Sequence, residues 1–286
     1  MTNSTANYAI KTMTRRELDL VIGWAAAEGW NPGLHDADCF YAADPNGFLV
    51  GVLNGEPIAS LSAVKYGKSF GFIGFYIVKP DFRGMGYGLK LWQAGLKSLQ
   101  SRNIGLDGVV AQQENYIKSG FNLAYRNIRY EGHGDGIVAE TPDYLVPLSL
   151  LPIETIIEYD RPFFPDDRSQ FLSCWVAQPG SDAIALMHYG SLAGYGVLRP
   201  CRTGHKIGPL FADRPQFAET LFLALKAKVP AGMPFYLDVP ETNLHAVELA
   251  NRYQMNSMFE TARMYTQDQP DLSLARTFGV TTFELG

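Results

Sequence analysis

The sequence predicts an α/β (α+β) protein of two consecutive units, each a mixed, mostly antiparallel sheet flanked by helices. Three observations support this fold class. The 286 residues exceed the usual size of one domain, so two units of about 140 residues are expected. An apolar stretch over 70–78 runs into a glycine-rich corner and then into a helical pattern. A similar succession of strand and helix patterns returns after residue 167.

The first unit begins with a helix and a hairpin. Thr14 and Glu17 form a capping-box pattern ahead of apolar residues at helical spacing, namely Leu18, Val21, Ile22 and Ala25. A loop over 29–38 follows. Asn54-Gly55 is a strong hairpin signal, and we expect strands on both sides of it and a third strand before the glycine corner: 47–53, 58–66 and 70–78.

After the corner, the pattern predicts a helix, a strand, a short helix and a closing strand. The buried face of the long helix carries Leu89, Trp92, Leu96 and Leu99. The remaining elements are expected at 106–110, 115–118 and 121–130. A stretch over 141–167 is rich in proline and acidic residues and indicates a junction, so the units are predicted at 1–140 and 141–286.

The second unit repeats this order. Strands are predicted at 182–190, 192–199, 206–211, 235–239 and 259–265, with helices around 217–225 and 244–253. The glycine corner is missing from the repeat, where Asp213 occupies the equivalent place. Asp213 is expected to cap the following helix, which would put a carboxylate where a diphosphate would bind. We therefore expect this unit to have a structural or acceptor-binding role.

Three glycines at alternate positions form the corner, namely Gly84, Gly86 and Gly88. Glycine lets the backbone approach a ligand closely, and the start of the following helix leaves N–H groups unpaired, so the corner suits an anion such as a diphosphate. The spacing fits neither the dinucleotide pattern G-x-G-x-x-G nor the P-loop pattern G-x-x-x-x-G-K-[ST].

The corner instead resembles the acetyl-CoA loop of the GCN5-related N-acetyltransferases. Arg83, Gly86 and Gly88 match that family's Gln/Arg-x-x-Gly-x-Gly/Ala signature, and the segment from Tyr116 to Phe121 matches a second block, Tyr-x-x-x-Gly-Phe. The tandem layout resembles a bacterial group of two-unit acetyltransferases. The resemblance implies acetyl-CoA as co-substrate, held by Ile77, Val78, Arg83, Gly84, Met85, Gly86, Tyr87 and Gly88.

The resemblance also implies direct attack of a primary amine on the thioester, with Tyr116 as the acid that protonates the departing thiolate. A phenol is protonated at neutral pH and can donate without tuning. The alternative interpretation is an aromatic residue packed under its helix. A covalent route through Cys39 has no supporting Cys–His motif.

The general base is harder to assign, because 70–78 holds no carboxylate. Asp38 is our candidate for the base, with Glu28, Asp36 and Trp30 of the same loop as acceptor-binding residues. The alternatives are solvated loop charges for the acids and a core position for Trp30. Asp107 is expected to cap a strand end.

Composition limits the partners. The chain has 24 Lys and Arg against 29 Asp and Glu, a net charge of −5, which gives no basic footprint for nucleic acid. Three separated cysteines and histidines without ligand spacing indicate reduced thiols and no metal site. Neither a signal peptide nor a membrane span is predicted, so a cytoplasmic location is expected. The oligomeric state stays open.

The leading interpretation is therefore an N-acetyltransferase acting on a small-molecule or amino-acid amine. A non-catalytic acyl-CoA sensor or interaction protein is the alternative favoured by the missing strand carboxylate. A protein N-acetyltransferase is a further alternative, which would require a groove for an extended peptide.

Overall fold

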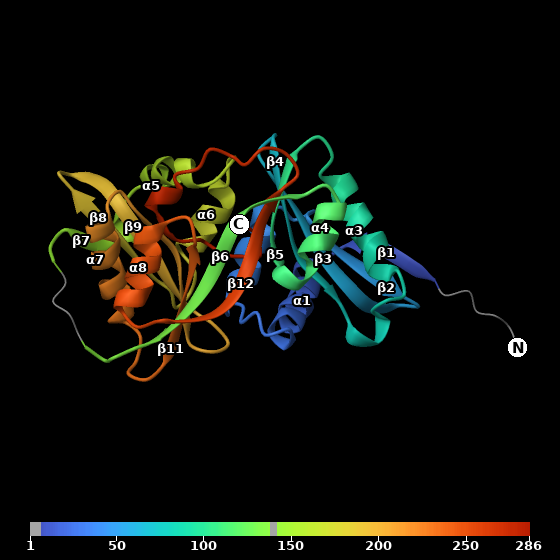
Figure 1. Ribbon diagram of the computed structural model, residues 1–286, viewed down its shortest axis with the longest axis horizontal. Helices are drawn as coiled ribbons and strands as arrows, with labels where there is room; N and C mark the ends of the chain where they lie inside the picture. The colour runs from blue at the N-terminus through green and yellow to red at the C-terminus, as the bar shows by residue number, and fades with distance from the viewer. Residues whose placement is uncertain (1–6, 138–141) are drawn as a thin grey trace, which may run out of the picture.

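The computed structural model describes residues 7–137 and 142–286, and their strands form one continuous mixed, mostly antiparallel sheet (Figure 1). Helices flank this sheet, so the predicted fold class is confirmed. The predicted boundary between residues 140 and 141 lies outside the described residues.

The first half of the chain follows the predicted order of elements. The capping box of Thr14 and Glu17 is present at the first helix. Two elements were not predicted: strand β1 and helix α2, which occupies part of the expected loop. The elements are β1 (Tyr8–Thr12), α1 (Arg15–Ala27), α2 (Asp36–Ala43), β2 (Phe48–Leu53), β3 (Glu56–Tyr66), β4 (Phe70–Val78), α3 (Tyr87–Ser98), β5 (Asn103–Val109), α4 (Gln113–Lys118) and β6 (Asn122–His133).

The second half also contains every predicted strand and helix. Within the stretch expected to be a junction, it adds β7 and α5, and a helix, α6, follows shortly after; a short strand, β13, lies close to the end. The elements are β7 (Leu145–Pro147), α5 (Ile153–Asp160), α6 (Ser169–Trp175), β8 (Asp182–His188), β9 (Ser191–Pro200), β10 (His205–Ala212), α7 (Pro215–Lys226), β11 (Pro234–Pro240), α8 (Leu244–Arg252), β12 (Asn256–Tyr265) and β13 (Thr277–Gly279).

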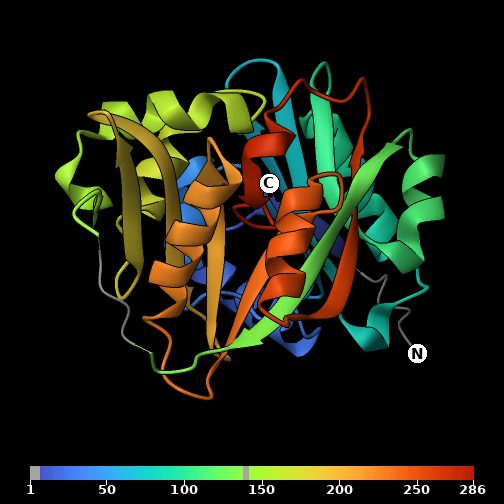
Figure 2. The same cartoon turned by 60° about the vertical axis from the view of Figure 1, so that its left-hand side comes forward.

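The two halves exchange their closing strands. Strand β12, from the second half, lies between β5 and β6 and pairs antiparallel with both. Strand β6, from the first half, lies between β12 and β11. Both strands run side by side through the middle of the molecule (Figure 2). The sheet of each half is therefore completed by a strand from the other half, since β5 pairs with β12 and β11 pairs with β6.

The apolar cores also connect the halves. Helix α3 covers one face of the first half, while α1 and α2 pack on the other face, where α2 meets α6 of the second half. Phe40 of α2 stacks on Trp175 of α6, with ring centroids 5.9 Å apart. Helices α7 and α8 cover a separate core in the second half. Each half therefore buries part of its apolar surface against the other.

The exchange predicts that a fragment ending at residue 137 does not fold alone. Without β12, both β5 and β6 would present unpaired backbone edges and the α2 surface would lose α6. Circular dichroism and thermal melting of the isolated fragment should show no cooperative transition. Co-expression with residues 142–286 should restore one. A fragment 1–137 that melts cooperatively by itself would contradict this prediction.

Candidate active site

A cavity of about 850 Å³ opens where β4 and β5 separate. The two strands pair in parallel from Phe70 to Ile73 of β4, and none of the strands in the described part of the chain pairs with the rest of β4 on that side. A bulge marks the separation, with Phe75 at φ +45° and its carbonyl oxygen accepting a hydrogen bond from the Ser60 hydroxyl at 2.8 Å. Ile77 and Val78 line the cavity, so their backbone groups stand at an open strand edge.

The glycine corner forms one end of this cavity. Gly84 and Gly86 have φ of +76° and +82°, which favours glycine, and Gly86 is the N-cap of α3. Gly88 serves close packing instead, because a Cβ atom there would lie 2.7 Å from the Tyr76 hydroxyl oxygen. Since all three glycines line the cavity, the positive end of the α3 dipole borders it.

Two residues predicted for this loop contribute no side chain to the cavity. Met85 is exposed to solvent, and Tyr87 stacks on Tyr8 with ring centroids 4.8 Å apart. Neither lines the cavity. Met85 and Tyr87 can therefore take part in binding an anion through the backbone alone.

Arg83 and Glu28 form an ion pair at the rim of the corner. The Arg83 guanidinium contacts the Glu28 carboxylate, and its Nε donates to the Val78 carbonyl at 2.8 Å. Both residues line the cavity. The Glu28 carboxylate is engaged with the arginine of the glycine corner, and this places it at the anion end of the cavity.

Tyr116 of α4 lines the cavity opposite β4. Its ring lies 5.7 Å from that of Trp92, and it fits against Gly108, where a Cβ atom would come within 2.2 Å of the ring. Burial, and secondarily the neighbouring Tyr76, raises the pKa of Tyr116 to about 12. The phenol therefore keeps its proton throughout the neutral range.

The structure contradicts two predictions for the loop after α1. Asp36 is buried, its Oδ1 lies 3.0 Å from Arg199 Nε, and its Oδ2 accepts from the Gly33 N–H. Asp38 is exposed on α2, pairs with Arg15 at 2.7 Å and does not line the cavity. Asp36 therefore joins the halves, and Asp38 is a surface charge outside the cavity lining. Both lie on a helix where a loop was expected.

Trp30 does line the cavity, with its ring 6.5 Å from that of Phe75. Its carbonyl oxygen accepts from Arg129 at 3.0 Å and from Lys206 at 3.2 Å. Cys39, in contrast, is buried in α2 away from the cavity. The geometry gives no support to a cysteine nucleophile.

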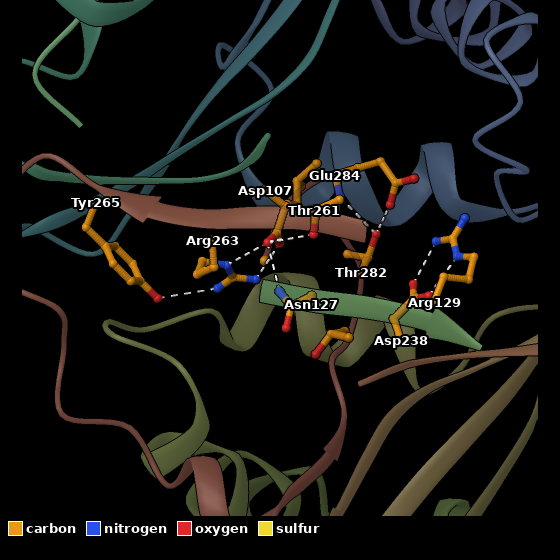
Figure 3. A network of polar contacts seen from close by, with 12 residues as sticks. Asp107, Asn127, Arg129, Asp238, Thr261, Arg263, Tyr265, Thr282 and Glu284 are labelled. Carbon is orange, nitrogen blue, oxygen red and sulfur yellow. Dashed lines mark hydrogen bonds and ion pairs between the residues drawn. The ribbon is translucent and has the colours of Figure 1, made fainter. Parts of the chain in front are cut away.

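Several lining residues escaped the sequence analysis because they come from exchanged strands and from the last residues of the chain. They are Arg129, Phe259, Thr261, Phe283 and Glu284, joined by Asp107, for which a cap was expected. Figure 3 shows the polar members of this set, Asp107, Arg129, Thr261 and Glu284, in a network that runs across β5, β12, β6 and β11. Alternation along each strand would have placed Asp107 on an inward face, but no motif indicates which strands lie next to each other.

The equivalent gap in the second half is filled by the chain itself. Strand β13 pairs antiparallel with β10 at Leu210 and Phe211, and the Val280 N–H then donates to the Asp238 carbonyl of β11 at 2.8 Å. Asp213 is not the predicted cap, because Arg214 is the N-cap of α7. The Asp213 carboxylate accepts from the Tyr159 hydroxyl and contacts Arg276.

Two searches of the described residues bear on other functions. Within 7–137 and 142–286, no group of three or more His, Cys, Asp or Glu residues is arranged to hold a metal ion. In the same part of the chain, none of the helices combines the length and the apolar character needed to span a membrane.

Comparison with known proteins agrees with this geometry. Residues 13–118 match the model of the acetyltransferase (GNAT) family, and residues 156–279 match a second model, an acetyltransferase (GNAT) domain. The chain is also 31% identical over 277 residues to the holothin acyltransferase of Pseudoalteromonas sp. (strain SANK 73390), with 96% of this chain and 94% of that protein covered. The chain belongs to the GNAT acyltransferase family and is a tandem member of it.

Solved structures share the fold. A proposed acetyltransferase from Pyrococcus horikoshii superimposes with a TM-score of 0.82 at 22% identity, covering 98% of this chain and 96% of that one. A tandem GNAT protein from the clavulanic acid biosynthesis pathway gives a TM-score of 0.61 at 14% identity, covering 92% and 100%. The two-unit arrangement therefore occurs elsewhere in the family.

The corner predicts a specific charge effect on acyl-CoA binding. Gly86→Glu should weaken acetyl-CoA binding at least about fivefold more than Gly86→Gln, because a like charge near a phosphate costs on the order of 1 kcal/mol or more. Gln is the matched control, since it shares the size and the backbone strain. Isothermal titration calorimetry measures both, with one site per wild-type chain expected. Equal affinities of the two variants would contradict the assignment.

Proposed function

We propose that this protein is an N-acetyltransferase that moves acetyl from acetyl-CoA to the primary amine of a small molecule by direct attack. One observation carries the proposal: the glycine corner, the open edge of β4 and the Tyr116 phenol border the same cavity. Bound acetyl-CoA would supply an activated acyl thioester at this place. The residues of the chain would supply binding, orientation and proton transfer.

The donor end of the cavity fits a diphosphate followed by an extended arm. Backbone N–H groups around Gly84 and Gly86 and the start of α3 favour anionic oxygens. The free edge at Ile77 and Val78 offers backbone groups to an amide-containing chain, in the way that one strand pairs with another. Arg83 is positioned to exchange its contact with Glu28 for a phosphate.

The acceptor end favours a small amine with an apolar or aromatic body. Trp30 and Phe75 stand on one side, while Phe259 and Phe283, whose ring centroids are 6.3 Å apart, contribute further aromatic surface. Aromatic walls of this kind enclose flat or apolar groups. The relative named for holothin acylation supports a small-molecule acceptor.

An amine panel tests the activity directly. Wild-type protein with acetyl-CoA should release thiol in the presence of aromatic and aliphatic primary amines, with holothin included, and the aromatic amines should give the higher kcat/KM. The amide product should be detected by mass spectrometry. Tight binding of acetyl-CoA without turnover of any amine would favour the non-catalytic sensor instead.

Tyr116→Phe should lower kcat by about 10²-fold or more, the scale expected when one general acid is removed. Affinity for acetyl-CoA should change little, because the ring and its packing on Trp92 remain. Tyr189→Phe is the matched control, since Tyr189 is almost fully exposed in the turn between β8 and β9. The wild-type profile should show no loss of rate from Tyr116 ionisation below about pH 11, given its raised pKa. An unchanged kcat in Tyr116→Phe would contradict the role.

A further inference from the structure

The last residues of the chain reach from the second half into the cavity of the first. After β13, the backbone passes under β4, where the Glu284 carbonyl oxygen would be 2.0 Å from a Cβ atom at Gly74. Leu285 is fully buried, and Phe283 and Glu284 line the cavity. The segment 280–286 therefore forms part of the site wall although it follows the second unit in sequence.

Three carboxylates from the described residues line the cavity: Glu28, Asp107 and Glu284. Glu28 is paired with Arg83 at the donor end. Asp107 is fully engaged, because Arg263 binds both of its oxygens at 3.0 and 2.5 Å and Asn127 donates to it at 2.8 Å. Neither is free to accept a proton from a ligand without losing these contacts.

Glu284 differs from both. Its Oε2 accepts a hydrogen bond from the Thr282 hydroxyl, and that hydroxyl oxygen accepts in turn from the Glu284 N–H at 3.3 Å, which fixes the side chain. Among the described residues, no lysine, arginine or histidine nitrogen lies within 4.0 Å of its carboxylate. The other carboxylate oxygen, Oε1, accepts no hydrogen bond from the described residues. It is also not one of the fully buried side-chain atoms that lack a hydrogen-bond partner. One oxygen is therefore available to a ligand.

The surrounding charges act at longer range. Burial opposes the charge of Arg129, but Asp238 and then Glu284 hold its pKa above the usual value. Burial lowers the pKa of Lys206, and the charge of Glu284 acts in the opposite direction, toward a higher pKa. The cations that interact with Glu284 at this range are Arg129 on β6, Arg199 on β9 and Lys206 on β10. Asp107 on β5 and Asp238 on β11 belong to the same polar network (Figure 3). The cations accommodate a buried carboxylate.

We propose that Glu284 is the general base of the first unit, supplied by the segment that follows the second. This assignment rests on the proposed function and names the residue that receives the proton of the acceptor ammonium. It replaces Asp38, which lies outside the cavity.

An acceptor R–NH3⁺ gives one proton to Glu284 Oε1 and becomes R–NH2. Its nitrogen then bonds to the acyl carbon while the carbon–sulfur bond breaks, and Tyr116 gives its phenol proton to the departing sulfur. The nitrogen loses its second proton as the amide forms, which restores Tyr116. Glu284 releases the first proton to solvent, so the reaction yields amide, free thiol and one H⁺.

Glu284→Gln tests this with little change in shape, since the amide oxygen can still accept from Thr282. With the best amine of the panel, kcat/KM at pH 7 should fall about 10²-fold or more. In the wild type, kcat/KM should depend only weakly on pH around neutrality, because Glu284 takes the proton of the bound ammonium within the site. In the variant it should rise about tenfold per pH unit up to the pKa of the amine, because free amine must then be supplied by the solution.

Glu260→Gln is the matched control. Glu260 lies on β12 between Phe259 and Thr261, which line the cavity, so its exposed side chain points to the opposite face. Acetyl-CoA affinity by calorimetry and melting temperature should be unchanged in Glu284→Gln, which excludes misfolding. A wild-type pH profile in Glu284→Gln would overturn the base while leaving the proposed function intact. Failure of the wild type to turn over any amine would overturn both.

Discussion

The exchange of β6 and β12 is the constraint on which the rest of the structure depends. Three buried ion pairs tie the halves together, each with one partner from either half: Asp107 with Arg263, Arg129 with Asp238, and Asp36 with Arg199. In an isolated half, each of these side chains would be a buried charge without its partner, which is strongly destabilising. The charges therefore favour this particular assembly of the halves over either half alone.

In both halves, two parallel strands separate part of the way along their length, but the gap between them is filled only in the second half. In the first, β4 and β5 separate after Ile73 and leave a cavity. In the second, β10 and β11 separate after Ile207, and β13 fills the gap with backbone hydrogen bonds to both sides. A strand edge in a protein interior must be paired. The second half meets this requirement with its own chain, and the proposed acyl-CoA would meet it in the first half. The filled gap in the second half is the physical reason for proposing one acyl-CoA site per chain.

Much of the local structure could be predicted from the sequence, because strand alternation, helical spacing, the Asn54-Gly55 turn and the capping box are local signals. The glycine corner and Tyr116 could also be recognised from the sequence, since each belongs to a short motif. Strand order was not, because the pattern of β12 is the same whichever neighbour it pairs with. Asp36 was misassigned for the same reason: its partner, Arg199, is 163 residues away.

Glu284 escaped prediction because it sits in a short final segment with no periodicity, and its place depends on a contact that sequence does not show. Strand β4 carries glycine at position 74, and any side chain there would collide with the Glu284 carbonyl. The final segment can therefore pass next to β4 only because β4 carries no side chain, and hence no carboxylate, at position 74. A strand that offered its own acid at this point would have a Cβ in the path of the segment. The first unit has an open position on its central strand, and the second unit delivers a carboxylate next to it, so the complete site exists only in the joined molecule.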